Sequence, residues 1–212
     1  MTASPTPPAQ AVAAHPTGAL PHATERLNRH GSALVVVDLQ ERIMPVIDGG
    51  AEVIERTRRL IVAARRLEIP VFLTEQVPEK LGATVTPVRD AYGPAPARVK
   101  AAFSGCESRT PDDTAGDTLL TALQRSGRRQ WILAGVETHV CVLQTALDLL
   151  AAGGAVFIVD DATASRDPRH RANALHRIER AGGVIVNHES VLFEWLSTAA
   201  APEFRDLSRL VR

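Results

Sequence analysis

The sequence predicts an α/β fold built around a parallel sheet, and two observations carry this prediction. Short apolar runs rich in β-branched residues alternate along the chain with longer segments of helical period, which is the pattern of βαβ units. The chain has 212 residues, of which 45% are hydrophobic and 23% charged, as in an ordinary globular protein. A single folded domain is therefore expected.

Six short apolar runs are the predicted strands. The first drives an apolar run directly into Asp38, and the third is the weakest of the six. In chain order, the predicted strands lie at 33–38, 70–74, 98–100, 130–134, 155–159 and 183–186.

The longer segments between these runs are the predicted helices. In the first, apolar side chains gather on one side and arginines on the other, as in a helix that covers a sheet. Gly127, Gly153 and Gly182 stand where three of the helices should end, consistent with glycine C-caps. The predicted helices span 51–67, 114–125, 139–152, 169–181 and 190–199, with a terminal helix at 202–211.

Residues 1–30 are predicted to form a flexible tail, and the folded domain is expected at 31–212. No formally charged side chain precedes Glu25, and five prolines are scattered through this stretch. The stretch has no basic region followed by an apolar one, so it does not read as a secretory signal. A cytoplasmic location is expected.

The charge balance indicates what kind of partner the protein binds. Lys and Arg together number 24, and so do Asp and Glu, which leaves a formal net charge of zero. Non-specific binding to nucleic acid or to an anionic membrane requires surplus positive charge, so both partner classes are disfavoured. No apolar stretch approaches the roughly 18 residues of a membrane span. The expected partner is a small molecule.

Three polar residues follow predicted strands and are candidates for one site, because parallel strands end at a common edge where ligands bind. They are Asp38, Lys100 and Cys141. Each also has an ordinary reading: Asp38 as a turn residue, Lys100 as a solvated surface group and Cys141 as a small buried hydrophobic residue.

Cys141 carries the most information of the three. If Thr138 is the helix N-cap, Cys141 sits in the first helical turn, where free N–H groups and the helix dipole favour a thiolate. A depressed pKa and faster alkylation than at Cys106 are therefore expected. With only two cysteines, the chain has neither a disulfide framework nor a four-cysteine zinc site, and Cys106 reads as incidental.

Several stretches together resemble the isochorismatase-like cysteine hydrolases, which include nicotinamidases and other amidases. The matching stretches lie at 33–41, 74–84, 99–104, 135–153 and 159–166, and the C-terminal stretch at 181–196 is also similar. The resemblance implies a three-layer α/β/α sandwich with a six-stranded parallel sheet in the order 3-2-1-4-5-6. It also implies a homo-oligomer.

The same resemblance implies a catalytic triad of Asp38, Lys100 and Cys141 that acts on a C–N bond, most simply that of a small amide. Asp38 would take the thiol proton, Lys100 would stabilise the thiolate, and Cys141 would form a thioester. A cis peptide bond between Val136 and Glu137 would turn the N–H groups of Glu137 and Cys141 toward the oxyanion.

The expected pocket wall comprises Gln40, Gln76, Phe103, Thr138 and His139, by position only. For Glu137 and His139, a turn facing solvent is an equal alternative. Asp161 and Arg166 match the family but equally suit a role in holding a loop.

No metal and no cofactor are expected. Nicotinamidases hold a divalent metal through an Asp-x-His pair and a further histidine after the second strand, and here 74–80 contains no histidine. Nicotinamide is therefore a doubtful substrate. Three alternatives stay open: vinyl-ether hydrolysis, which Cys141 disfavours; a nucleotide- or flavin-binding module, which would need a glycine-rich loop after the first strand; and a catalytically idle or ligand-binding family member.

Overall fold

The computed structural model describes residues 22–110 and 117–211. Most of the predicted tail and the start of the helix predicted at 114–125 lie outside the described residues. No helix in the described part has the length and apolar composition of a membrane span.

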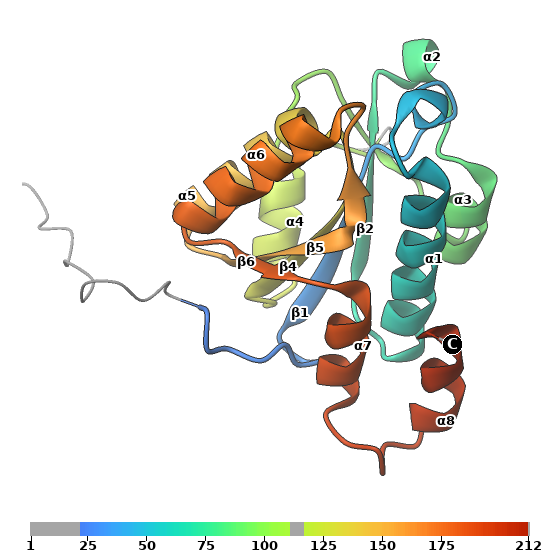
Figure 1. Cartoon of the computed structure of the whole chain (residues 1–212), viewed down its shortest axis with the longest axis vertical. Coiled ribbons are helices and arrows are strands. Elements are labelled where there is room, and N and C mark those ends of the chain that lie inside the picture. Colours follow the sequence, from blue (N-terminus) through green and yellow to red (C-terminus); the bar gives the residue numbers. More distant parts are fainter. Residues whose placement is uncertain (1–21, 111–116, 212) are drawn as a thin grey trace, which may run out of the picture.

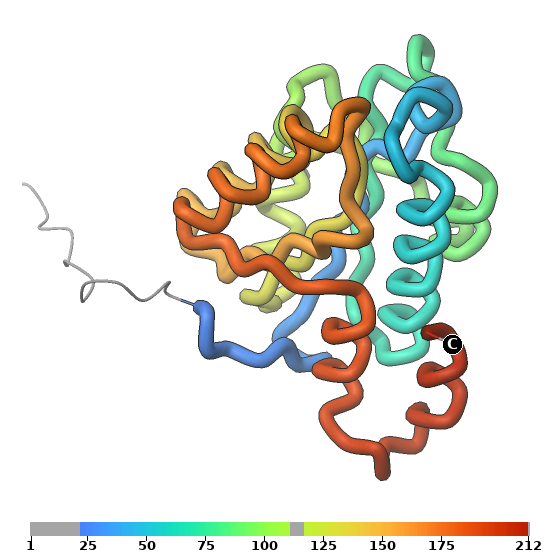
Figure 2. The backbone as a smooth tube through the Cα atoms, viewed as in Figure 1, coloured from blue at the N-terminus to red at the C-terminus, as the bar shows by residue number. Residues whose placement is uncertain are grey.

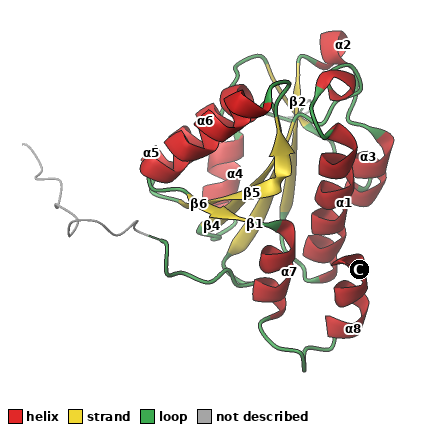
Figure 3. Ribbon diagram, in the orientation of Figure 1, coloured by secondary structure: helices red, strands yellow, loops and turns green. Residues whose placement is uncertain are grey.

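Six parallel strands form one sheet in the order β3-β2-β1-β4-β5-β6, which confirms the predicted topology (Figure 3). Strands β2, β4 and β5 extend beyond their predicted ends, because ladder pairing with neighbours continues there. The strands are β1 (Ser32–Val37), β2 (Val71–Gln76), β3 (Arg98–Lys100), β4 (Gln130–Val136), β5 (Ala155–Ala164) and β6 (Val184–Val186).

The helices match the prediction closely where they are long and differ where they are short. The short helices α2 and α3 were not predicted. Each begins with a proline in its first turn, and each is too short to show a helical period. The helices are α1 (Gly50–Arg66), α2 (Pro78–Leu81), α3 (Thr86–Tyr92), α4 (Leu119–Arg125), α5 (Leu143–Ala151), α6 (Pro168–Arg180), α7 (His188–Leu196) and α8 (Phe204–Leu207), with 3-10 turns at Met44–Val46 and Ser208–Val211.

The sheet is covered on both faces. In Figure 1, α1, α3 and α7 lie on one side of it and α4, α5 and α6 on the other. The sequence of β1 is continuously apolar because both of its faces are buried. Leu34 and Val36 pack in the core on the α1 and α7 side of the sheet, while Ala33, Val35 and Val37 pack in the core on the α4, α5 and α6 side. A buried strand in the middle of the sheet thus ends in Asp38.

Residues 26–28, which the sequence assigns to the tail, contact the folded part of the chain, and the boundary at residue 31 stays a prediction. Leu27 is buried in the core, and its N–H donates to Glu194 Oε2 in α7 (2.6 Å). The Gln130 side chain accepts from the Asn28 N–H (3.0 Å) and donates to the Arg26 carbonyl (3.0 Å). Figure 2 shows this N-terminal segment running toward α7. The sequence does not predict these contacts, because the segment is polar in composition and its partners lie in distant parts of the chain.

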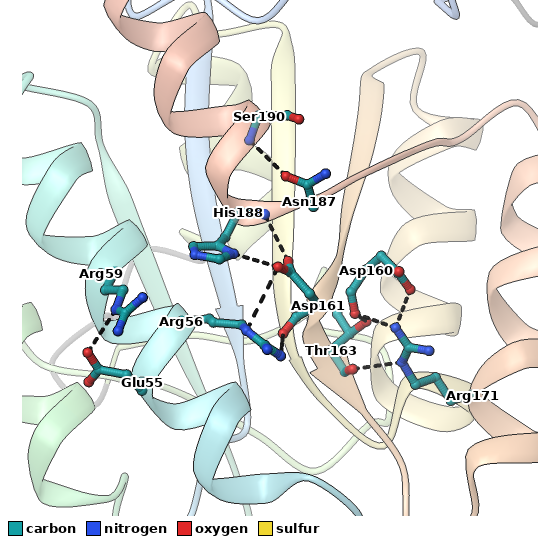
Figure 4. A network of polar contacts seen from close by, with 10 residues as sticks. All are labelled: Glu55, Arg56, Arg59, Asp160, Asp161, Thr163, Arg171, Asn187, His188 and Ser190. Atoms are coloured by element: carbon teal, nitrogen blue, oxygen red, sulfur yellow. Dashed lines mark hydrogen bonds and ion pairs between the residues drawn. The ribbon is translucent and has the colours of Figure 1, made fainter. Parts of the chain in front are cut away.

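A polar network anchors the carboxyl half of β5 to the helices around it (Figure 4). Asp161 accepts from the His188 N–H (2.8 Å) at the start of α7, and its carbonyl accepts from Arg56 of α1 (3.0 Å). Arg171 of α6 pairs with Asp160 and donates to the Thr163 carbonyl (2.9 Å). Burial favours a higher pKa for Asp161, but hydrogen bonds from His188 outweigh it and lower that pKa. Asp161 therefore joins β5 to α7 and α1.

Candidate active site

The three candidate catalytic residues lie at the carboxyl edge of the sheet, after β1, at the end of β3 and after β4. Asp38 follows β1 directly with a φ of 57° and is 2% exposed. Lys100 is 4% exposed and Cys141 7% exposed. Strand order reverses between β1 and β4, so this edge is the switch point where ligands bind in such folds.

Asp38 and Lys100 form a buried ion pair. Lys100 Nζ lies 2.7 Å from Asp38 Oδ2, and the Thr74 hydroxyl donates to Oδ1 (2.7 Å). The Nζ–Oδ2 contact is close but lacks hydrogen-bond alignment, so Oδ2 accepts no hydrogen bond from any described residue. Oδ2 is therefore the oxygen that remains able to accept a proton.

Lys100 is held by groups other than Asp38 as well. Its Nζ donates to Gln76 Oε1 (2.6 Å) and to the Phe103 carbonyl (3.1 Å). Gln76 in turn donates to the Ala101 carbonyl (2.8 Å). Both polar ends of the Gln76 amide are thus occupied within the protein. In this arrangement the Gln76 side chain fixes the lysine, and its role in binding substrate stays a prediction.

Gln40 is likewise committed to internal contacts. Its Nε2 donates to the carbonyls of Gln76 (3.0 Å) and Gly82 (2.7 Å), and its Oε1 accepts from the Gln76 N–H (2.8 Å). The side chain is fully buried. Gln40 therefore joins the end of β2 to the following loop, and a role in substrate binding stays a prediction.

The turn that carries Cys141 differs from the expected one in two ways. The Val136–Glu137 peptide bond is trans, and no cis bond occurs among the described residues. The chain turns instead through positive φ angles at Gly135 (145°) and Glu137 (54°). Thr138 is not the N-cap, because it is the first residue of a π-helical turn, Thr138–Val142, that precedes α5.

Two hydrogen-bond donors in this turn are unused. The Glu137 N–H has no acceptor among the described residues. The Thr138 hydroxyl is fully buried and also lacks a partner in the described part of the chain. Buried donors of this kind are costly unless a ligand engages them, and they suit a developing oxyanion.

The Cys141 thiol is neutral in the resting site, contrary to the sequence prediction. Burial, and after it the Asp38 charge, raise its pKa to about 12, while Lys100 opposes the rise. Cys106 is also buried, which raises its pKa to about 11. Burial thus outweighs the helix-terminus effect on which the prediction relied. Any reaction of this thiol as a nucleophile would require a base to take its proton, and Asp38 is the carboxylate whose charge acts on it.

This raised pKa predicts the pH dependence of alkylation. The rate at Cys141 should rise about tenfold per pH unit from pH 7 to 10, because the thiolate fraction grows in that proportion below the pKa. Asp38→Asn should speed alkylation at a given pH, because it removes the anion that raises the thiol pKa. Iodoacetamide labelling followed by peptide mass spectrometry measures both. A rate that levels off below pH 8 would contradict a raised pKa.

The remaining predicted residues surround this turn. Phe103 is 55% exposed beside the Lys100 loop. His139 lies 3.0 Å from Ser165 Oγ through Nδ1, and its ring centroid is 4.7 Å from that of His170. The buried Glu137 carboxylate pairs with Arg166 (3.1 Å). Glu137 and Arg166 therefore hold each other and fix the loop after β5 against the Cys141 turn.

The end of β2, which corresponds to the metal-binding strand end of nicotinamidases, makes different contacts in this protein. Glu75 Oε1 accepts from the Thr84 N–H (2.8 Å) and hydroxyl (2.7 Å), so this carboxylate is used to hold a loop. No group of three or more His, Cys, Asp or Glu side chains suited to a metal occurs among the described residues. The residues present therefore do not fit such a metal site, and the absence of a bound metal stays a prediction.

A cavity of about 980 Å³ opens elsewhere, between residues 26–30, α7 and the segment that follows α7. Trp195, which lines it, donates to the Ser32 hydroxyl (2.9 Å) at the start of β1. This cavity is thus at the opposite edge of the sheet from Cys141. None of its lining residues is a cysteine or part of the Asp38–Lys100 pair, so this cavity is separate from the candidate active site.

Sequence reasoning missed two residues of the site. Thr74 holds Asp38, and its signal was its position at the end of the predicted second strand. The other is Thr145, whose hydroxyl donates to the Cys141 carbonyl (2.6 Å). Its signal was a spacing of four residues after Cys141, which places it one helical turn further on.

Comparison with known proteins agrees with this architecture. The family profile of the isochorismatase domain matches residues 32–190. The secreted isochorismatase effector Isc1 of Phytophthora sojae is 35% identical over 203 residues, with 92% of each chain covered.

Two solved structures are also similar. One is the MAR1 ribonuclease of Caenorhabditis elegans, with a TM-score of 0.79, 36% identity and coverage of 88% of this chain and 92% of that one. The other is YcaC from Pseudomonas aeruginosa with hexane-2,5-diol and covalent acrylamide, with a TM-score of 0.73, 25% identity and coverage of 89% and 96%. On the match to the domain and to these relatives, the chain belongs to the isochorismatase family.

Proposed function

We propose that this protein is a cysteine hydrolase that cleaves the C–N bond of a small amide through a thioester on Cys141. The observation that carries the proposal is the buried Asp38–Lys100 pair, 2.7 Å apart, with both side chains acting on the Cys141 thiol. A nucleophile, a base and a cation at one sheet edge are the parts that covalent acyl transfer requires.

In the first half of the reaction, Cys141 forms the acyl-enzyme. The thiol proton passes to Asp38 Oδ2 as sulfur attacks the carbonyl carbon, and the carbonyl π electrons move to oxygen. The Glu137 N–H is available to stabilise this oxyanion. When the oxyanion collapses, the C–N bond breaks, and the leaving nitrogen takes the proton from Asp38. An amine or ammonia departs, and the thioester remains.

In the second half, water hydrolyses the thioester. Asp38 takes a proton from the water as its oxygen attacks the acyl carbon, and the C–S bond then breaks. The sulfur recovers the proton from Asp38, and a carboxylic acid leaves. The Lys100 ammonium takes no part in these bond changes. It stabilises the thiolate as that charge develops, while Thr74 holds the other carboxylate oxygen in place.

The neighbour that holds covalent acrylamide supports a nucleophilic site. Acrylamide is an unsaturated amide that is captured by nucleophilic side chains, so its covalent attachment to YcaC fits a reactive group on this fold. For the present chain, the inference is that Cys141 is that group.

RNA cleavage is a second candidate, favoured by the name of the Caenorhabditis elegans relative. The formal net charge of zero disfavours it, because binding to a phosphate backbone relies on surplus positive charge. The predictions of a homo-oligomer, a cytoplasmic location and a domain at 31–212 stay predictions beside the proposed function.

The test is a substrate screen with a covalent readout. Purified protein is incubated with a panel of small amides, ureido acids and hydroxamates, a vinyl ether and a labelled RNA. Amine release is measured, and acid-quenched protein is analysed by intact and peptide mass spectrometry. We expect turnover of at least one C–N compound and an acyl mass on the Cys141 peptide. Turnover of RNA or the vinyl ether alone, or an acyl group on a different residue, would refute the proposal.

A further inference from the structure

We propose that Thr145 is a positioning residue that holds Cys141 in register with Lys100. This inference rests on the proposed function, because it assigns Thr145 to the hydrolytic site. Thr145 lies in α5, one turn after Cys141, and is completely buried.

The Thr145 hydroxyl joins two separate parts of the site. It donates to the Cys141 carbonyl (2.6 Å) and accepts from the Gly105 N–H (2.7 Å). Gly105 belongs to the loop after β3, whereas Cys141 follows β4, and β2 and β1 lie between those two strands. One hydroxyl therefore connects segments that the sheet keeps apart.

The loop held by Thr145 also holds Lys100. The carbonyls of Ala102 and Phe103 accept from Lys100 Nζ at 3.4 and 3.1 Å. A continuous path thus runs from the Lys100 ammonium, through Phe103 and Gly105, to Thr145 and the Cys141 carbonyl. Because the ammonium must face the thiolate as it forms, the distance between these two segments matters to the reaction.

The Gly105 loop packs closely against Thr145. A Cβ added to Gly105 would lie 3.2 Å from Thr145 Oγ1 and 3.4 Å from its Cγ2. Cys106 Sγ lies 3.9 Å from the Thr145 carbonyl. Glycine at 105 thus permits the approach that the hydroxyl completes, and Cys106 packs behind it.

A hydroxyl suits this position because it both donates and accepts. Valine has nearly the same shape but can do neither. In Thr145→Val, the buried Gly105 N–H loses its acceptor, and the Cys141 carbonyl, at the junction of the π-helical turn and α5, loses a donor. The loop and the nucleophile turn are then free to move apart, while the apolar packing is kept.

The test compares Thr145→Val with Thr145→Ser and with Thr57→Val. Thr57 is a matched control, because its hydroxyl is also fully buried but has no partner among the described residues, and it lies in α1 on the other face of the sheet. Two readouts need no substrate: hydrogen exchange of the Gly105 amide, and the rate and pH profile of Cys141 alkylation by iodoacetamide. The third readout is kcat and KM on an amide from the screen.

In Thr145→Val, Gly105 exchange should speed up, Cys141 alkylation should change its rate and pH profile, and kcat should fall about 10- to 100-fold with KM little changed. Thr145→Ser should stay close to the wild-type protein in all three readouts. The control Thr57→Val should also give wild-type values in all three. If Thr145→Val does not fold, Gly105→Ala provides a second test. Its added methyl group would push against the Thr145 hydroxyl and should cause the same fall in kcat.

Three results would overturn the inference. They are unchanged Gly105 exchange in Thr145→Val, unchanged Cys141 alkylation in that variant, and an equal loss in Thr145→Ser, which would assign the effect to the methyl group. An unchanged rate and pH profile of Cys141 alkylation in Gly105→Ala would also overturn the inference. Failure of the proposed function appears elsewhere, as an acyl group on another residue or as turnover that survives in Cys141→Ala.

Discussion

Replacing Cys141 by alanine is expected to lower kcat by about 10⁴-fold or more, because the change removes the atom that forms the thioester. Asp38 and Lys100 remain paired in that variant, but no nucleophile remains beside them. Turnover of an amide from the screen, followed by amine release, measures the effect. Acid-quenched Cys141→Ala should carry no acyl mass.

Cys106→Ala is the matched control for this prediction. Cys106 is equally buried, lies in the same core as Cys141, and accounts for the only other thiol in the chain. Its loss should leave kcat within about threefold of wild type, because a small buried cysteine contributes packing and not chemistry at this position. If Cys141→Ala keeps a tenth or more of the wild-type kcat, covalent catalysis through Cys141 is excluded.

The fold was predictable because its signals are local. A continuous apolar run such as β1 and an amphipathic segment such as α1 each carry their pattern within one element, and the structure has both within a residue of the predicted bounds. The strand order came from family resemblance. Leu27 and the helices α2 and α3 were missed for the opposite reason: Leu27 is buried by distant contacts, and helices of one or two turns have no period to detect.

The position of the three candidate catalytic residues could be predicted from the sequence, whereas the contacts around them could not, and their catalytic role stays a prediction. Asp38, Lys100 and Cys141 stand at strand ends, and the parallel topology brings such ends together. Gln40 and Gln76 also follow or end strands, which made them look like pocket residues. Their amides are instead satisfied by partners far along the chain, and only the three-dimensional structure reveals such pairings.

The predicted state of the nucleophile was wrong for a related reason. A helix N-terminus lowers a cysteine pKa by a local effect, which is readable from sequence. Burial and the Asp38 charge act through space and raise the pKa more strongly. Under the proposed function, a neutral thiol next to a carboxylate makes proton transfer part of the attack on substrate. It also protects Cys141 from adventitious oxidation, because the thiolate is the reactive form.

Gly135→Ala is expected to be severely destabilising and to disrupt the active-site turn. Gly135 has a φ of 145°, and an added Cβ would lie 2.3 Å from the Val37 carbonyl oxygen and 2.7 Å from Val37 Cβ. Val37 precedes Asp38 and pairs with Gly135 in the ladder between β1 and β4. The same close approach therefore brings the base and the nucleophile turn together. Backbone strain and overpacking together should cost about 3–5 kcal/mol in the free energy of unfolding.

Gly153→Ala separates the clash from the cost of the backbone conformation. Gly153 also has a positive φ, 83°, but a Cβ there would meet nothing within 4 Å. This control should lose only about 1 kcal/mol and keep full activity, since Gly153 lies after α5, away from the catalytic edge. Urea unfolding of the two variants measures the difference. Equal losses of stability in the two variants would mean that β1 and β4 can move apart at Gly135 without cost. The close approach of their backbones would then not position Asp38 against the Cys141 turn.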